Sequence, residues 1–249
     1  MIAPARIYAW PHRKFHLARV QEITWQPEAG SAARLVCPLP AIPAPGRYAL
    51  AWDPEDAGAA LAQVVFAAGL QDAFEADQLE NSFLATPAAA GWQPGMQLHL
   101  SGPLGRGFTP PPGIRRLALA ALGGALERLL PLAGLALHNG AAVAAFSDSP
   151  LPPLPPAIEV QPLSALPEAP GWADYLALDV PLQKLERLRP ALGLPPEHNS
   201  LACPAQALVT AAMPCGGLGA CGVCAVETRR GPRLACSDGP VFDLAELLR

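Results

Sequence analysis

The sequence predicts a multi-domain α+β chain with three parts: an antiparallel β-barrel over residues 1–110, a reduced α/β domain over 111–200 and a small cysteine-rich module over 201–249. Three observations predict this organisation. Short apolar runs separated by Pro/Gly turns fill the first part. A strand–helix–strand pattern opens the second. Four of the chain's six cysteines cluster within 22 residues of the third.

The composition narrows the class of protein. The chain is 51% hydrophobic and 15% charged, which favours a packed core over disorder. Its net charge of −4 gives no basic surface, so neither nucleic acid nor anionic lipid is an expected partner. The basic start lacks the apolar stretch of a signal peptide. The most apolar segment, 117–137, carries Glu127 and Arg128 at its centre, so we expect no membrane span and a soluble, cytoplasmic protein.

The barrel is predicted from four short runs and the turns between them. The runs read FHLARVQEI, ARLVCPL, RYALAW and MQLHLSG, and APGR, DPEDAG, QPGM and GPLGRG divide or follow them. Alternating or apolar runs of this length are typical of strands. Cys37 lies inside the second run, so we expect it in the core.

The α/β part begins with one strand–helix–strand unit. IRRLALAAL predicts a buried strand, the next 18 residues a helix ending at Asn139-Gly140, and AAVAAFSDS a second strand. The proline-rich segment 149–160 predicts a loop or edge. Residues 172–193 predict one or two short helices, and FDLAELLR predicts a terminal helix.

The clustered cysteines have the spacing Cys215-x5-Cys221-x2-Cys224-x11-Cys236. Four thiolates select zinc or an iron–sulfur cluster, and a reducing cytoplasm disfavours disulfides. Structural zinc usually takes two C-x2-C pairs, but here there is one. The loop around the first cysteine contains Gly216, Gly217 and Gly219, whose backbone can approach a larger group closely. The pattern favours a [2Fe–2S] cluster, with structural zinc or unmetallated thiols as alternatives.

These motifs also resemble a known family. PCGGLGACGVC…LACSDGPVF is similar to the C-terminal module of the electron-transfer subunit of class 1B dihydroorotate dehydrogenase, within the ferredoxin-reductase-like proteins. GPLGRGF resembles that family's G-P-L-G-x-G-F, and PGRYALAW stands where members have P-G-Q-F. The resemblance implies a barrel and a middle domain that bind FAD and NAD, and a cluster that links the FAD to a partner dehydrogenase.

The flavin motifs of that family are altered here. The stretch that should supply an Arg and a hydroxyl reads AALAQVVFAAG, and the phosphate loop is replaced by NSFLATPAAA. The resemblance would still place Gly102, Pro103, Leu104 and Gly105 at a flavin site, with Arg47 or Arg106 as substitute cations. We expect the barrel to be retained as a scaffold, with FAD binding as the alternative.

The nicotinamide motif is altered further. The family's glycine-rich turn reads GGALERLLPL here, which places Glu127 where the phosphates would lie. We therefore do not expect NAD to bind. Cys203 matches a family cysteine near the nicotinamide, but without that cofactor a buried structural thiol is expected.

The resulting hypothesis is an accessory subunit rather than a catalyst on its own. It would pass electrons between the flavin of a dihydroorotate dehydrogenase-type catalytic subunit, in a hetero-oligomer, and an unidentified acceptor. Two alternatives are a complete FAD-containing, NADH-linked reductase subunit and a zinc-stabilised, non-redox assembly subunit.

Overall fold

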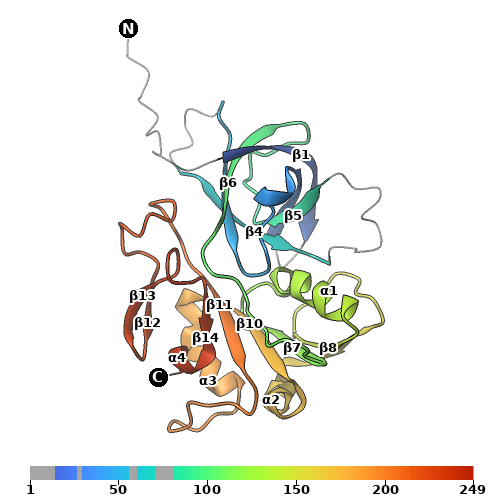
Figure 1. Ribbon diagram of the computed structural model, residues 1–249, viewed down its shortest axis with the longest axis vertical. Helices are drawn as coiled ribbons and strands as arrows, with labels where there is room; N and C mark the ends of the chain where they lie inside the picture. The colour runs from blue at the N-terminus through green and yellow to red at the C-terminus, as the bar shows by residue number, and fades with distance from the viewer. Residues whose placement is uncertain (1–14, 27–29, 56–60, 71–80, 249) are drawn as a thin grey trace.

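The computed structural model describes residues 15–26, 30–55, 61–70 and 81–248. A closed six-stranded barrel lies above a six-stranded mixed sheet in Figure 1, and a two-stranded ribbon lies at the left of that sheet. The described residues from 15 to 104 build the barrel. The rest builds the sheet, the helices on its two faces and the cysteine segment.

The barrel strands follow the order β1-β2-β5-β4-β3-β6. They are β1 (Phe15–Gln26), β2 (Gly30–Val36), β3 (Tyr48–Trp52), β4 (Gln63–Ala68), β5 (Ser82–Thr86) and β6 (Gln97–Leu104), with the 3-10 helix η1 (Leu39–Ala41) after β2. The four runs predicted as strands are confirmed as β1, β2, β3 and β6. Alternate residues of β3 divide between two cores: Ala49 and Ala51 point into the barrel, whereas Tyr48 and Leu50 pack against the rest of the molecule.

The sheet below the barrel has the order β14-β11-β10-β7-β8-β9. Its strands are β7 (Arg116–Ala121), β8 (Ala142–Phe146), β9 (Ile158–Gln161), β10 (Tyr175–Pro181), β11 (Ala205–Thr210) and β14 (Val241–Asp243). Only the β11–β14 pairing is antiparallel. The chain builds outward from β7 through β8 and β9, then returns to add β10 and β11 on the other side. The carboxyl ends of β7 and β10 are therefore the switch point, where such sheets commonly bind ligands.

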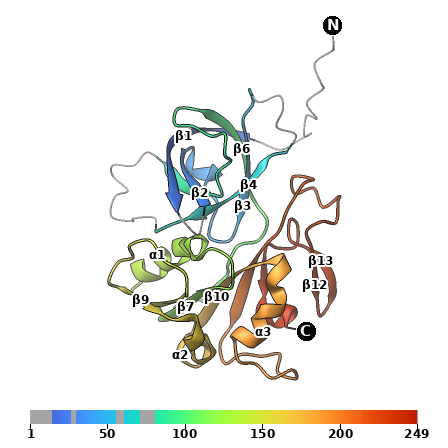
Figure 2. The ribbon, with the colours of Figure 1, turned by 180° about the vertical axis from the view of Figure 1, so that it is seen from behind.

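Helices cover both faces of this sheet, as the two views show (Figures 1 and 2). Leu117 and Leu119 of β7 pack toward η2 (Leu126–Arg128) and α1 (Leu130–His138), whereas Ala118 and Ala120 face the opposite core. That second core includes residues of η3 (Leu163–Glu168), α2 (Ala169–Trp172) and α3 (Leu188–Ala191), which follows η4 (Leu182–Arg187). The strand–helix–strand unit and the edge position after the proline-rich loop are confirmed.

One prediction for this region is incomplete, because it missed a strand. Residues 172–193 were expected to form one or two short helices, but Tyr175–Pro181 is the central strand β10. Because neighbouring strands flank β10 and helices cover both its faces, the whole run from Tyr175 to Val180 is buried, without strand alternation. Short helices occur only after it, at η4 and α3.

The cysteine segment is built into the same sheet. β11 pairs with β10, and β14 returns beside β11, so the segment between them, residues 211–240, leaves the sheet and comes back to it. This excursion contains the cysteine loop and the ribbon of β12 (Ala225–Thr228) and β13 (Gly231–Leu234). The terminal helix α4 (Leu244–Leu247) is shorter than predicted because Val241–Asp243 is a strand. Within the described residues, no helix has the length and apolar character needed to cross a membrane.

Candidate metal centre

The four predicted ligands lie in one excursion of the chain but differ in exposure. Cys224 and Cys236 are buried, Cys215 is half-buried and Cys221 is exposed. Cys224 immediately precedes β12, and Cys236 follows β13, so the ribbon brings these two cysteines together. Cys215 and Cys221 lie on the glycine-rich loop. The site therefore has an inner end within the core and an outer end at the surface.

The glycine loop adopts a backbone that other residues rarely accept. Gly216, Gly217 and Gly219 have φ values of 59°, 72° and 70°, in the left-handed region that glycine tolerates without a steric penalty. The loop turns tightly enough to direct several successive N–H groups inward. The three glycines predicted from sequence thus shape the site, and they do so through the main chain.

These N–H groups point at cysteine sulfurs. Burial acts to raise the pKa of the Cys215 thiol, but hydrogen bonds from the backbone N–H groups of Cys221, Ala220 and Leu218 outweigh it and lower that pKa to about 6. The N–H of the intervening Gly219 points at the Cys236 sulfur. Four consecutive backbone donors, residues 218–221, therefore face two of the thiols. Such a nest of N–H groups favours a thiolate and stabilises an anionic iron–sulfur group.

The thiols interact in pairs. Side-chain hydrogen bonds join Cys215 to Cys221 and Cys224 to Cys236. Burial and the neighbouring Cys224 raise the pKa of Cys236 to about 11. In the described part of the chain, no three His, Cys, Asp or Glu side chains are grouped around one point as a single metal ion would require. The four thiols, joined in two pairs, form a donor set of the kind that holds iron–sulfur clusters.

The predicted flavin residues Gly102, Pro103, Leu104 and Gly105 lie at the end of β6, where the barrel meets the cysteine segment. A side chain at Gly105 would collide with Pro240, with the carbonyl of Gly239 and with the Tyr48 ring. The backbone N–H of Arg106 donates to the Gly239 carbonyl at 2.5 Å. This motif therefore packs tightly against the residues that follow Cys236.

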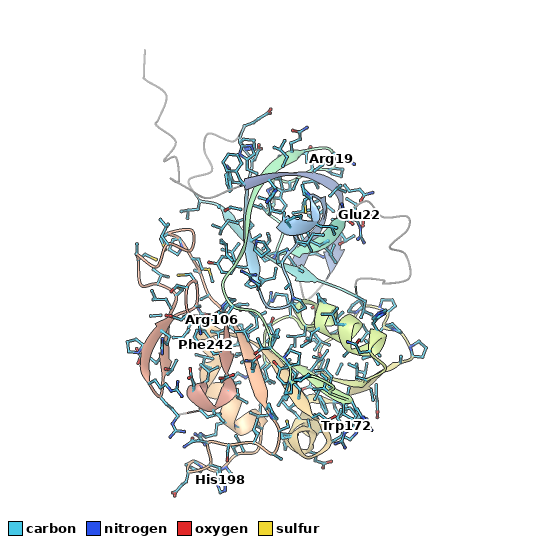
Figure 3. All side chains as sticks on the ribbon, viewed as in Figure 1. Arg19, Glu22, Arg106, Trp172, His198 and Phe242 are labelled. Atoms are coloured by element: carbon cyan, nitrogen blue, oxygen red, sulfur yellow. The ribbon has the colours of Figure 1, made fainter. Side chains whose placement is uncertain are left out.

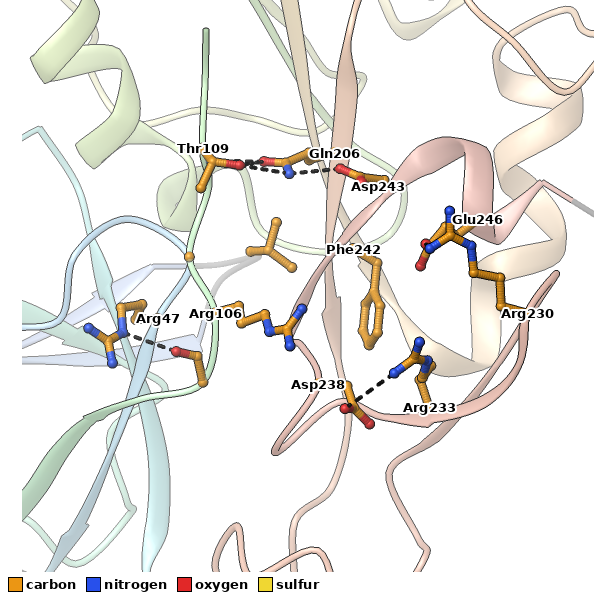
Figure 4. A pocket seen from close by; sticks show the side chains of 13 residues that line it. Arg47, Arg106, Thr109, Gln206, Arg230, Arg233, Asp238, Phe242, Asp243 and Glu246 are labelled. Carbon is orange, nitrogen blue, oxygen red and sulfur yellow. Dashed lines mark hydrogen bonds and ion pairs between the residues drawn. The ribbon is translucent and has the colours of Figure 1, made fainter. Parts of the chain in front are cut away.

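A cleft of about 620 Å³ opens beside this contact (Figure 4). Arg106 and Phe242 lie side by side in it (Figure 3). The side chain of Arg47 is held by the carbonyls of Gly105 and Pro103, at 3.1 and 3.0 Å. The other two arginines of the cleft pair with its carboxylates: Arg230 with Glu246 at 3.2 Å, and Arg233 with Asp238 at 3.7 Å. Two of the four arginines that line the cleft are thus paired with its carboxylates.

The switch point of the sheet is filled by side chains. Arg128 donates two hydrogen bonds to the Asp179 carboxylate, at 2.7 and 2.9 Å. Asp179 is fully buried and the Arg128 side chain is 12% exposed. Burial alone would lower the pKa of Arg128, but Asp179 reverses the effect and raises it. The Arg128 guanidinium also lies 5.8 Å from the centre of the Phe66 ring on β4. An internal ion pair therefore occupies the crevice where a parallel sheet commonly binds its ligand.

The glycine turn after β7 is closed in the same way. A side chain at Gly124 would collide with Asp179, and the Lys184 ammonium donates to the Gly123 carbonyl at 3.3 Å. Glu127, expected beside the phosphates, lies buried in η2, and its carbonyl accepts a hydrogen bond from the N–H of Gly69. The turn is thus occupied by contacts within the chain.

The sequence interpretation did not identify Asp179, Arg128 or Tyr48 as site residues. Asp179 carries a signal, because it is a single acid within the apolar run YLALDV and buried carboxylates need partners. No sequence signal marks Tyr48, because tyrosine is common in β-strands. The two cysteines outside the ligand set, Cys37 and Cys203, are buried as predicted.

Comparison with known proteins agrees with this geometry. Residues 210–248 match the family described as the iron–sulfur cluster binding domain of dihydroorotate dehydrogenase B. No curated protein matches the chain significantly.

Solved structures with the same fold extend the comparison to most of the chain. An NADH-dependent reduced ferredoxin–NADP oxidoreductase aligns with a TM-score of 0.66 and 15% identity, over 92% of this chain and 88% of that one. A cytochrome P450 reductase from Amycolatopsis aligns with a TM-score of 0.52 and 17% identity, over 72% and 66%. The ferredoxin reductase of carbazole 1,9a-dioxygenase gives 0.51 and 16%, over 73% and 64%.

The barrel and sheet establish the fold, and the cysteine loop establishes the cluster-binding segment. The chain therefore has the fold of these reductases, and its residues 210–248 match the iron–sulfur cluster binding domain of dihydroorotate dehydrogenase B.

Proposed function

We propose that this protein is an electron-transfer subunit that conducts electrons singly between a flavin-containing dihydroorotate dehydrogenase-type catalytic subunit and an external acceptor. The observation that carries the proposal is the loop whose N–H groups at residues 218–221 face the thiols of Cys215 and Cys236. When bound there, an iron–sulfur cluster supplies one-electron oxidation and reduction. The chain supplies four thiolates, backbone donors and a buried inner wall.

The filled switch point supports a conductor rather than a complete reductase. A dinucleotide phosphate needs N–H groups or cations facing an open crevice. Here Asp179 places a carboxylate in that crevice, and Arg128 is committed to it through two hydrogen bonds. Phe66 stands on the strand where the resemblance would place the flavin-binding Arg and hydroxyl. We therefore propose that the chain carries neither NAD nor FAD.

The exposed rim of the cysteine loop supports a docked partner. Leu218 is 59% exposed and Val223 is 52% exposed, on either side of the exposed Cys221. Between Ala211 and Val226 the sequence has no charged side chain. An apolar, uncharged rim of this kind is typical of the centre of a protein interface. We propose that the catalytic subunit covers this rim and thereby approaches the outer end of the site.

The proposed partner face is tested by co-purification with a tagged dihydroorotate dehydrogenase catalytic subunit. Leu218→Glu places a charge at the centre of the interface and should reduce complex formation by at least about tenfold, since each 1.4 kcal/mol of binding energy is tenfold. Leu135→Glu, on α1, is the matched control because Leu135 is similarly exposed, at 54%. Equal binding by the two variants would show that the rim is not the interface.

A further inference from the structure

We infer that Tyr48, a barrel residue, is a positioning residue for the cluster and raises its reduction potential. This inference rests on the proposed function, because it assumes that the four cysteines hold a redox cluster. Tyr48 lies on β3, 167 residues before Cys215 in the sequence, and its side chain is fully buried. It is therefore a long-range contribution of the barrel to the centre.

The first observation is a hydrogen bond to a ligand residue. The Tyr48 hydroxyl donates to the main-chain carbonyl of Cys236 at 2.9 Å, within the core. A buried hydroxyl bond has strong electrostatic influence because the surroundings screen it poorly. The bond also fixes the peptide that carries the inner thiol.

The second observation concerns the opposite wall of the site. A side chain at Gly217 would collide with the Tyr48 hydroxyl oxygen, so this oxygen lies directly against the glycine loop. The hydroxyl is thus placed between the segment that carries Cys236 and the loop that carries Cys215. The Tyr48 ring packs closely against Gly105, where an added Cβ atom would lie 2.9 Å from the ring. The centre of the Phe66 ring is 6.3 Å from the centre of the Tyr48 ring. The tyrosine therefore cannot turn away from the centre.

These contacts predict the direction of the effect. Reduction adds negative charge at the thiolate ligands, and hydrogen-bond donors near those ligands favour the reduced state. The O–H dipole of Tyr48 directs its positive end at the Cys236 peptide. Replacing the hydroxyl by hydrogen should therefore make reduction less favourable and lower the potential. No such effect is expected from a tyrosine that only fills space.

The test is a redox titration of the anaerobically purified full chain, followed by the electron paramagnetic resonance signal of the reduced state. Tyr48→Phe should change the ratio of reduced to oxidised cluster, at a fixed potential, by roughly threefold to tenfold toward oxidised. Tenfold corresponds to about 59 mV for a one-electron couple. Tyr175→Phe is the matched control: Tyr175 is also buried, but its hydroxyl bonds to Gln206 rather than to a ligand residue.

A second pair of variants keeps the test decisive if Tyr48→Phe fails to retain its cluster. Gly217 and Gly222 share a φ of 72°, so alanine is strained equally at both, but only at Gly217 does the new methyl group meet Tyr48. Gly217→Ala should therefore shift the potential or reduce the iron content more than Gly222→Ala.

Two results would overturn the inference: a potential for Tyr48→Phe equal to that of Tyr175→Phe, or, where Tyr48→Phe is empty, equal behaviour of the two alanine variants. A wild-type chain that contains no iron would instead overturn the proposed function itself.

Discussion

At the scale of single residues, the six cysteines have three different environments. Cys215 has a pKa lowered to about 6 by backbone donors, whereas burial raises the pKa of Cys37 to about 11. For Cys203, burial raises the pKa, and the nearby Asp174 adds to the effect. Thiolates bind metals and react, whereas buried neutral thiols do neither. Burial also raises the pKa of Cys236 to about 11, so it is the shared loop and ribbon, and not burial, that set the four candidate ligands apart from Cys37 and Cys203.

The proposed ligand set predicts the outcome of serine substitution. Cys221→Ser should lose or alter the cluster signal, because a hydroxyl is a poorer ligand than a thiolate for iron. Cys203→Ser should leave the visible and electron paramagnetic resonance spectra unchanged, since Cys203 lies outside the ligand set. Spectra of the two purified variants, measured side by side, check both statements. An unaltered signal in Cys221→Ser would remove this residue from the ligands.

The shifted pKa values also predict a pH-dependent labelling pattern in the metal-free protein. At pH 8 Cys215 is ionised and Cys37 is protonated, so iodoacetamide should label Cys215 far faster. Because the folded pKa of Cys37 lies above its ordinary value of 9.0, the stability from burying this thiol is complete below pH 9. It is lost as the pH rises toward 11. Peptide mapping after timed alkylation measures the labelling rates of Cys215 and Cys37. Equal labelling rates at pH 8 would contradict the difference in pKa between the two thiols.

At the scale of secondary-structure elements, the joint between barrel and sheet depends on η2. Arg128 reaches Asp179 on β10 and lies over Phe66 on β4, while the Glu127 carbonyl accepts the N–H of Gly69. One short helix therefore fixes β4 of the barrel to the central strand of the sheet. The space that a nucleotide would fill is used to join the two parts.

This joint predicts that two arginine substitutions lower the free energy of unfolding by different amounts. Arg128→Ala leaves the Asp179 carboxylate buried without a partner and should lower the free energy of unfolding by about 3–5 kcal/mol. Arg116→Ala removes a surface ion pair with Asp174, 2.9 Å long, and should lower the free energy of unfolding far less, because solvent screens an exposed pair. Urea unfolding of the two variants compares these values. Similar losses would mean that the buried pair is not a stabilising joint.

The elements also show where sequence reasoning succeeds. β1, β2, β3 and β6 could be predicted because Pro/Gly turns bound short apolar runs. The central strand β10 was missed because its short apolar run carries Asp179 and leads directly into the helix-like segment after Pro181, and a short apolar run does not distinguish a buried strand from a helix. The Arg128–Asp179 pair could not be predicted for a different reason: its members are 51 residues apart in the sequence. The four cysteines, by contrast, could be proposed as ligands from the sequence because their spacing is local.

At the scale of the whole molecule, the cysteine segment is an excursion from the main sheet rather than an appendage. Its flanking strands β11 and β14 belong to that sheet, and Cys224 and Cys236 share a core with β10. The barrel contributes Tyr48 from above. All three parts predicted from the sequence therefore meet around the inner end of the site, while the outer end at Cys221 faces solvent. This arrangement suits a conductor with one buried and one exposed side.

The central claim is that the chain holds an iron–sulfur cluster and no flavin. The most direct measurement is the visible absorption spectrum of the anaerobically purified chain before and after dithionite, with iron, sulfide, zinc and flavin assayed on the same sample. The account predicts broad bands that dithionite bleaches, about two irons and two sulfides per chain, and no flavin. One bound flavin per chain would contradict the conductor, and a colourless zinc-containing protein would contradict the redox function altogether.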